Sequence, residues 1–269
     1  MRKIFFAILA AAFMIPKDAV AQSPFYFKMD LTSSNIWSAT FLGIPAIVVN
    51  TLLSTDEDDE NGSGRLGTHF RVATYKKGGR TMDVYGVNKM PPFKNIGHNF
   101  KQMVGFKAED LFRDFEYSVK FGWQPVQIPV GFFARFGYRH ESFRFREDDQ
   151  SEWIKHRMEV LRPGLGIRIS PLENLMDEKG WCPVVEFGSS YDFHVGYRGG
   201  YDNNKKEIND GLSTHVGIGV KTEGASIIFD IERDHYDLFN KDFEYNGTKP
   251  YADVTSNRWC FSISIARDF

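Results

Sequence analysis

Apolar residues alternate with polar or small residues along most of the second half of the chain. Successive side chains of a β-strand point to opposite faces, so this period of two predicts strands that are apolar on one face only. The pattern is clear in residues 115–123, 130–139, 181–197, 212–221, 226–232 and 259–269. Short connections at 125–128 and 222–224 largely alternate with long ones at 140–156, 198–210 and 236–255, and the connection 170–180 is an exception because it is long where a short turn is expected. These features predict an antiparallel sheet of consecutive hairpins.

Weaker patterns predict four more strands. Residues 67–75 and 80–88 alternate poorly, Pro163 interrupts the run at 157–169, and a first strand is placed within residues 39–50. The count is then about ten, with eight or twelve as alternatives, and an even number suits a single-chain bacterial barrel. We therefore expect an all-β fold, a closed antiparallel transmembrane β-barrel formed by one domain.

The polar face of these strands carries charged and imidazole side chains. In a membrane-spanning barrel the apolar face contacts lipid and the polar face lines the lumen, where opposite charges can pair. A soluble barrel or sandwich has the same period with the apolar face turned inward, so alternation alone does not separate these folds from a membrane barrel. For the membrane barrel we predict a polar network in the lumen, made of Lys120, Arg135, Arg168, Glu186, His194, His215, Asp230 and Glu232.

The N-terminus has the features of an export signal. Arg2 and Lys3 precede an apolar stretch, and Ala19-Val20-Ala21 is a small-x-small cleavage site. We expect a signal peptide at 1–21 and a barrel domain at 22–269, in which residues 22–38 form a periplasmic or lumen segment. Residues 36–53 carry no charge, and three alternatives are open for them: a buried first strand, a segment inside the lumen, or a spanning helix.

The C-terminus carries the most specific pattern, because Trp259, Phe261, Ile263, Ile265 and Phe269 form the apolar face of an alternating last strand. Its last strand resembles the signal by which the assembly machinery of Gram-negative bacteria recognises outer-membrane barrels. The chain thus resembles small outer-membrane β-barrel and porin-like proteins. The resemblance implies a location in the cell outer membrane, with outer-membrane lipid, lipopolysaccharide and the barrel assembly machinery as partners.

The composition agrees with an outer-membrane barrel and argues against a nucleic-acid-binding protein. The 25 Phe, 11 Tyr and 5 Trp residues accompany a charged fraction of 25%, as expected for strands that are apolar on one side only. Removing Arg2, Lys3, Lys17 and Asp18 from 33 basic and 35 acidic residues leaves 30 and 34, a charge of -4 for the exported chain. Nucleic acid is therefore not an expected partner.

Candidate chemistry in the sequence is sparse, and we expect no cofactor, metal site or catalytic set. His140, Glu141 and Ser142 stand at a predicted rim, but neighbours on a strand point to opposite faces, which makes this tripeptide a poor triad by itself. His235 is a second rim histidine. The acidic run at 56–62 has Asn61 where a calcium loop needs glycine, so a solvated loop is expected.

The predicted function is structural, adhesive or narrow-pore transport in the outer membrane. The alternatives are an outer-membrane hydrolase with catalytic residues at the rim and a soluble lipocalin-like binder. Cys182 and Cys260 are placed near opposite ends of their strands and are not expected to form a disulfide.

Overall fold

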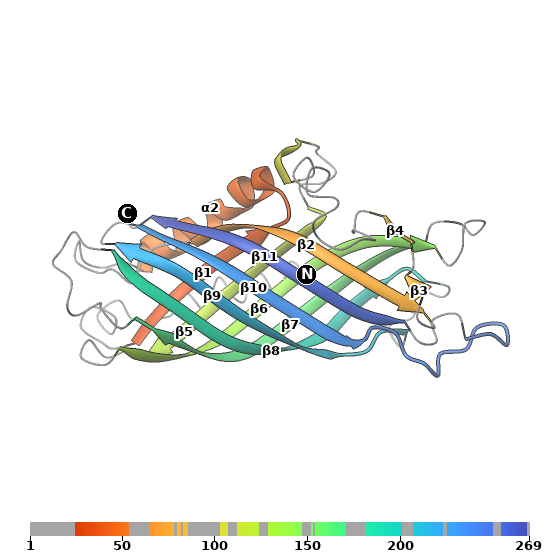
Figure 1. Cartoon of the computed structure of the whole chain (residues 1–269). Coiled ribbons are helices and arrows are strands. Elements are labelled where there is room, and N and C mark those ends of the chain that lie inside the picture. The colour runs from red at the N-terminus through yellow and green to blue at the C-terminus, as the bar shows by residue number, and fades with distance from the viewer. Residues whose placement is uncertain are drawn as a thin grey trace.

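The chain folds into a single sheet that wraps around one axis, with one helix beside it (Figure 1). This computed structural model describes residues 25–53, 65–77, 80–81, 83–85, 103–106, 112–123, 129–146, 152, 154–170, 181–200, 207–222, 225–249 and 254–267. In chain order the elements are β1 (Phe25–Ser33), α2 (Ile36–Leu53), β2 (Arg65–Lys77), β3 (Arg80–Thr81), β4 (Asp83–Tyr85), β5 (Asp114–Trp123), β6 (Val130–Arg146), β7 (Ile154–Ile169), β8 (Cys182–Arg198), β9 (Gly211–Thr222), β10 (Ala225–Asp237) and β11 (Thr255–Arg267).

The sheet closes on itself. Each strand from β5 to β11 pairs antiparallel with the next, β11 pairs with β2, and β5 pairs with β1. The ring is completed where residues 30–33 of β1 pair in parallel with residues 65–68 of β2. Nine of the described strands form the ring, while β3 pairs with β2 and β4 pairs with β6. The predicted closed antiparallel barrel is confirmed, with a ring one strand short of the ten expected.

The odd number follows from how the first two strands of the ring are connected. A ring whose neighbours are all antiparallel needs an even number of strands, and the parallel β1–β2 pair removes that requirement. Parallel neighbours need a long crossover connection, which α2 supplies. The prediction of a strand within residues 39–50 is wrong, because these residues are helical. The expectation of a periplasmic or lumen segment at 22–38 is also wrong for residues 25–33, which form β1.

The two ends of the barrel differ in their connections. The end at which β11 finishes carries the short connections 124–129 and 223–224 and the longer connection 170–181, and we call it the turn end. The opposite end carries the connections 147–153, 199–210 and 238–254, and we call it the loop end. β7 continues through Pro163, which pairs with Phe136, so the expected interruption of this strand does not occur.

Helix α2 lies on the outside of the barrel wall (Figure 1). Asn35 caps it, since its Oδ1 accepts hydrogen bonds from the backbone N–H groups of Trp37 and Ser38 at 2.9 and 3.4 Å. The helix packs against β1 and β2, and the hydroxyl of Tyr117 on β5 donates to the carbonyl of Leu42 at 2.6 Å. No helix among the described residues is long and apolar enough to cross a membrane.

The contact between α2 and the barrel is made by small residues. Ala39 and Ala46 are buried, while the larger Trp37, Phe41 and Ile44 are exposed. Small side chains let the helix axis approach the strands closely, and the outward side chains of β1 are buried beneath it as a result.

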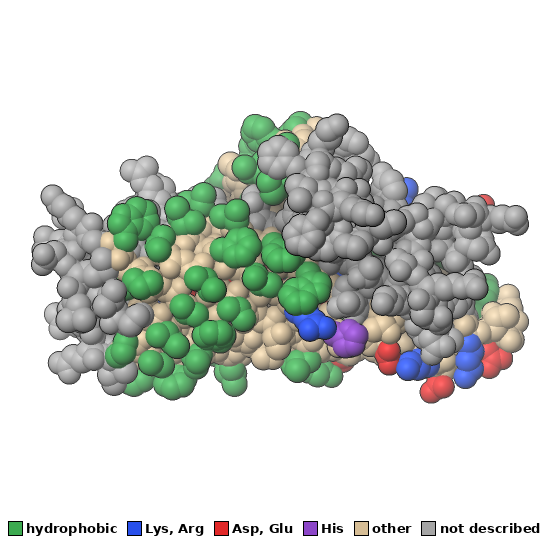
Figure 2. All heavy atoms as spheres, in the orientation of Figure 1, with side chains coloured by type: hydrophobic (Ala, Val, Ile, Leu, Met, Phe, Trp, Pro, Cys, Tyr) green, Lys and Arg blue, Asp and Glu red, His purple; other side chains and the backbone are tan. Residues whose placement is uncertain are grey.

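The outer face of the sheet is apolar and exposed. Figure 2 shows that hydrophobic side chains gather over the part of the barrel near the turn end, while charged side chains lie toward the loop end. A soluble monomer seldom exposes so wide an apolar surface. The exposed large hydrophobics of the strands include Phe121, Phe132, Phe136, Leu165, Phe187, Tyr191, Phe193, Leu212, Ile218, Phe229, Trp259, Ile263 and Ile265.

The inner face is polar and buried. Its arrangement is the reverse of the lipocalin alternative, which needs an apolar lining around a ligand, and that alternative is overturned. Cys182 and Cys260 are both buried and form no disulfide. Through the shared partners Lys221 and Ser226, Cys182 lies level with Ala266 on β11, six residues from Cys260. At ~3.3 Å per residue this is ~20 Å, far beyond disulfide reach.

Candidate functional site: an ion-paired barrel interior

Arg162 of β7 lies at the centre of the barrel interior and is 1% exposed. Its Nε donates to Asp192 Oδ1 at 2.7 Å and its Nη1 donates to Glu116 Oε2 at 2.7 Å. Its Nη2 donates to Ser213 Oγ at 2.6 Å and lies 2.8 Å from Glu232 Oε1. One guanidinium thus binds side chains from four other strands, β5, β8, β9 and β10.

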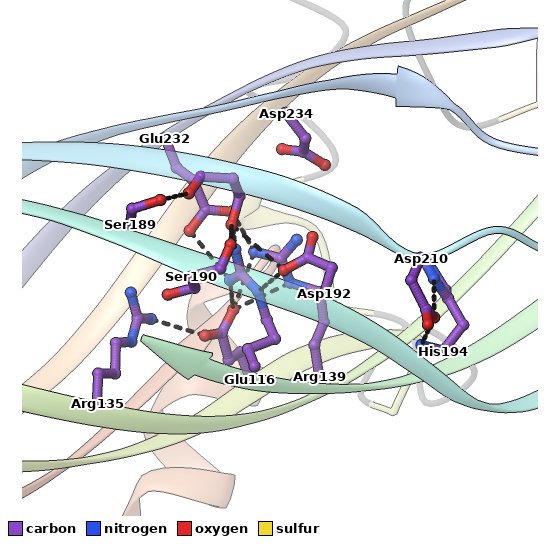
Figure 3. A network of polar contacts seen from close by, with 12 residues as sticks. Glu116, Arg135, Arg139, Ser189, Ser190, Asp192, His194, Asp210, Glu232 and Asp234 are labelled. Carbon is purple, nitrogen blue, oxygen red and sulfur yellow. Dashed lines mark hydrogen bonds and ion pairs between the residues drawn. The ribbon is translucent and has the colours of Figure 1, made fainter. Parts of the chain in front are cut away.

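Two further arginines neutralise the same carboxylates. Arg135 Nη2 donates to Glu116 Oε1 at 2.6 Å, and Arg139 Nε donates to Glu116 Oε2 at 3.0 Å. Arg139 Nη2 also donates to Glu232 Oε1 at 2.6 Å. Figure 3 shows these side chains pointing toward one another between the strands. We call this set the central cluster: Glu116, Arg135, Arg139, Arg162, Asp192 and Glu232.

A second group, the loop-end cluster, lies one layer closer to the loop end. It consists of Arg258 of β11, Glu141 of β6 and Asp234 of β10, and Arg258 forms ion pairs with both carboxylates. Its Nη2 is also 4.0 Å from Asp192 Oδ2, which connects the loop-end cluster to the central cluster. Arg258 is 1% exposed. Buried charges of this kind are tolerated only when they are paired, because desolvation of an unpaired ion costs several kcal/mol.

The clusters link opposite walls of the barrel. Arg139 is on β6 and Glu232 is on β10, and β7, β8 and β9 lie between these strands in the ring. Arg258 and Glu141 are likewise joined across the ring, from β11 to β6. The described interior is therefore crossed by ion pairs instead of being lined by them.

Glycines on the inner face make room for these large side chains. Gly137 of β6 pairs with Arg162 of β7, and a Cβ at Gly137 would lie 2.9 Å from Glu116 Oε1 and 3.3 Å from Arg162 Cβ. Such distances leave no space for a side chain beside the guanidinium.

Toward the turn end the interior holds a separate pair. Lys120 Nζ of β5 donates to Glu186 Oε2 of β8 at 2.6 Å, and Nζ also lies 4.9 Å from the ring centroid of Phe133. The rings of Phe133 and His215 are 6.2 Å apart. Arg168 is the strand partner of Glu186, and Asp230 is the strand partner of Gly217, where a Cβ would lie 2.4 Å from Asp230 Oδ1.

The eight residues predicted for the lumen are thus divided among several places. Arg135 and Glu232 belong to the central cluster, Lys120 and Glu186 form their own pair, and His194 Nδ1 lies 3.7 Å from Asp210 Oδ1 near the loop end. Arg168, His215 and Asp230 take the positions given above.

Several residues of the clusters were not in the predicted set. Alternation already places Glu116, Arg139 and Asp192 on the polar face, so this pattern was sufficient to find them. Arg162 lies beside the apparent interruption at Pro163, and Asp234 and Arg258 lie beyond the predicted ends of their strands. Their inclusion needed strand ends that the alternation does not define.

At the loop end the interior is apolar. A cluster that we call the apolar plug packs inside the barrel mouth, and residues after β10 contribute to it. The backbone of 207–209 pairs with that of 238–240, including Asn209 N to Leu238 O at 3.0 Å, which holds these residues over the mouth. The members of the apolar plug are Phe143, Met158, Val160, Tyr197, Leu238, Phe239 and Val254.

A β-bulge brings Tyr197 into the apolar plug. Glu159 pairs with Gly196 but Val160 pairs with His194, so Val195 is an extra residue on β8. Two residues opposite one reverse the side-chain alternation beyond this point. The hydroxyl of Tyr197 consequently lies inside, 2.6 Å from His156 Nδ1, and donates to Glu207 Oε2 at 3.2 Å.

The rim tripeptide is split between the two faces of β6. Glu141 points inward to Arg258, whereas the even-numbered His140 and Ser142 share the outer face with Phe136. The ring of His140 stacks on Phe115 with 5.5 Å between centroids. His235 is exposed on β10, far around the ring from β6, so the two rim histidines do not converge.

Other candidate sites lie wholly or partly outside the described residues. The structure does not describe the acidic run at 56–62, the predicted signal peptide at 1–21 or Phe269. Within the part of the chain that the structure describes, no group of three His, Cys, Asp or Glu side chains is arranged to hold a metal ion.

A closed antiparallel barrel with an apolar exterior and a charged, paired interior is the architecture of small outer-membrane β-barrels. The chain has this architecture. Four of the five residues in the predicted C-terminal signal lie on β11, and the exposed Trp259, Ile263 and Ile265 are on its outer face.

Comparison with known proteins gives a likeness in fold only. No protein-family model matches the sequence, and no curated protein is similar to it in sequence. The crystal structure of the outer membrane protein OprG from Pseudomonas aeruginosa is 11% identical with a TM-score of 0.38, over 76% of this chain and 94% of that chain. The outer membrane enzyme PagL is 13% identical with a TM-score of 0.30, over 58% and 91%. Ail, the attachment invasion locus protein of Yersinia pestis, is 11% identical with a TM-score of 0.27, over 75% and 95%.

Proposed function

We propose that the protein resides in the outer membrane as a closed barrel and acts through its wall and loop end, in a structural or adhesive role, instead of serving as an open pore. The observation that carries this proposal is the set of ion pairs across the interior, above all Arg139 to Glu232 and Arg258 to Glu141. A ring of nine strands is also narrow, because interiors near eight strands fill with side chains and wide channels need about sixteen.

The apolar surface near the turn end fits a lipid environment, and the charged surface near the loop end fits water and lipid headgroups. Short turns are typical of the periplasmic side, so the loop end is proposed to face the exterior. Outer-membrane lipid, lipopolysaccharide and the barrel assembly machinery remain the proposed partners, the last through β11.

Solute permeability tests the closed interior. The refolded full chain, reconstituted in liposomes, should not accelerate swelling in small sugars, and it should give no steady channel in planar bilayers. The double variant Arg139→Ala, Glu232→Ala removes a contact across the interior and should raise ion leak above the wild type. The control double variant Arg233→Ala, His235→Ala changes two exposed side chains on the outer face of β10 and leaves the interior intact. A wild-type barrel that passes sugars freely would refute the closed interior.

Hydrolysis of a lipid ester at the rim is a second candidate, and one observation favours it. His140 and Ser142 share the outer face of β6, and Glu159 of β7 is the direct strand partner of His140 on that face. Directly opposite residues have Cβ atoms about 5 Å apart, so a nucleophile, a base and an orienting carboxylate are neighbours at the edge of the apolar surface.

Loss of acyl chains from lipid A, followed by mass spectrometry, tests this candidate. Ser142→Ala should abolish release, and Glu159→Gln should lower it. His140→Phe preserves a ring that can stack on Phe115, so a loss of activity in this variant would reflect the loss of the imidazole base. The control is His235→Phe. If wild-type protein in lipid A-containing membranes releases no acyl chain, the hydrolase candidate is rejected and the closed structural barrel stands.

A further inference from the structure

Four basic side chains are grouped on the outer face of β6, β7 and β8 near the loop end. Arg157 pairs directly with Arg198, and Arg144 pairs directly with Lys155. All four are exposed. We call them the basic cluster, and its two halves are adjacent because Arg157 and Lys155 are two residues apart on β7.

The pairing of like charges in the basic cluster has an energetic cost. Cβ atoms of directly opposite strand residues are about 5 Å apart, and like charges in this relationship destabilise a sheet. Arg157 and Arg198 form no ion pair with a carboxylate of the described residues, and the nearest acidic strand neighbour on this face is Glu159. Strand pairing places Arg157 and Arg198 directly opposite each other, and an anion bound between their guanidinium groups would offset the repulsion.

Local backbone geometry maintains this arrangement. Gly199 follows Arg198 with a φ of 127°, in the region that side chains rarely adopt. A Cβ at Gly199 would lie 2.1 Å from the carbonyl oxygen of Lys155, so only glycine allows the end of β8 to lie against β7 at this level. The close approach keeps Arg198 beside Arg157.

The position of the basic cluster relative to the apolar surface indicates the kind of anion. The outer face of β7 runs from the exposed Leu165 through Leu161 and Glu159 to Arg157. Four residues separate Leu161 from Arg157, ~13 Å along the strand. An anion bound at the basic cluster therefore lies about one headgroup beyond the apolar surface, and acyl chains attached to it would reach the exposed Phe193 and Phe136 below.

We propose that the basic cluster binds the phosphate groups of an acylated glycolipid of the outer leaflet. Guanidinium groups form forked, charge-assisted hydrogen bonds with phosphate oxygens, and the aromatic and aliphatic surface beside them binds the acyl chains. The proposal rests on the outer-membrane location proposed above and adds a defined lipid site to it.

Native mass spectrometry of the full-length barrel in detergent, titrated with lipid A, tests the site. Wild-type protein should retain bisphosphorylated lipid A at least about tenfold more strongly than the Arg157→Gln, Arg198→Gln double variant, because the variant loses two charge-assisted contacts to phosphate oxygens. Arg157→Lys, Arg198→Lys should retain part of the binding. The charge-matched control Lys241→Gln, Lys249→Gln alters exposed residues after β10 and should bind as the wild type does.

Three outcomes would overturn the site: equal retention by the double variant, equal binding of chemically dephosphorylated lipid A, or equal occupancy by inorganic pyrophosphate without a lipid. Boil-dependent electrophoretic migration confirms that each variant is folded. A folded, membrane-inserted barrel without phosphate-dependent binding refutes the site alone. A chain that never enters membranes refutes the location as well.

Discussion

Arg139 on β6 and Glu232 on β10 form an ion pair of 2.6 Å through the barrel interior, although three strands separate them along the wall. The same Arg139 binds Glu116, and Glu232 in turn binds Arg162. The outer face of a membrane barrel contacts lipid, so only the side chains of its inner face are buried within the protein. These shared carboxylates allow the inner face to hold its charges without water around each one.

Arg162 is the residue whose loss should be most costly for stability. Arg162→Met leaves Asp192 and Glu116 buried beside fewer cations, and removal of one partner from a buried pair typically costs about 3–5 kcal/mol. Urea unfolding from lipid vesicles measures the change. Lys241→Met, which removes an exposed partner of Asp237, should change stability by less than about 1 kcal/mol. Equal effects of the two substitutions would contradict the role of the central cluster.

Tyr197 should stabilise the loop end through its hydroxyl. Tyr197→Phe removes a hydrogen-bond partner shared by His156 and Glu207, and the loss of a hydrogen bond to a buried polar group costs about 1–3 kcal/mol. Tyr191→Phe is the matched control, because Tyr191 is exposed on the outer face of the same strand. Urea unfolding should show a loss for the first and little change for the second. The reverse order would show that the apolar plug does not depend on this hydroxyl.

Helix α2 should respond to bulk at its contact with the wall. Ala46 is fully buried, and Ala46→Phe should cost about 1–3 kcal/mol by overpacking. Ile44→Phe, two residues away on the exposed side of the helix, should be tolerated. Unfolding midpoints in detergent compare the two. If both are neutral, α2 is not held against β1 and β2 in the way described here.

The alternation of the sequence was enough to predict antiparallel strands with one apolar face, and the pattern of the last strand then favoured a closed membrane barrel. Long strands such as β8, with Phe187 and Phe193 opposite Glu186 and Asp192, were close to their observed limits. The strand ends were missed at the loop end, where the outer face becomes charged and the inner face carries apolar residues such as Phe143 and Met158. There the chain leaves the apolar surface, and the sequence no longer distinguishes the faces.

The N-terminal part was predicted less well for a different reason. Residues 36–53 are apolar all round, and a short uncharged run fits a strand or a helix equally. What decides its structure is the tertiary contact of Ala39 and Ala46 with the wall, together with the parallel β1–β2 pair. Cross-barrel partners such as Arg258 and Glu141 were equally hidden, since they are 117 residues apart.

The lipid-facing surface should reject charge in a depth-dependent way. Ile218 is 58% exposed on the outer face of β9, and Ile218→Arg should destabilise the membrane-inserted barrel by ~2–4 kcal/mol. His235→Arg, near the loop end, should have little effect. Refolding into lipid vesicles under a urea gradient measures both. A neutral Ile218→Arg would mean that this face contacts water.

The most direct test of a membrane barrel with an apolar exterior is fractionation of cells that express the full chain, followed by electrophoresis of the extract with and without boiling. We predict that the protein is extracted only with detergent and that the unboiled band migrates apart from the boiled one, because the paired strands resist detergent until heated. A protein that is soluble in buffer, with migration that boiling does not change, would contradict the membrane barrel and require another explanation for its exposed apolar face.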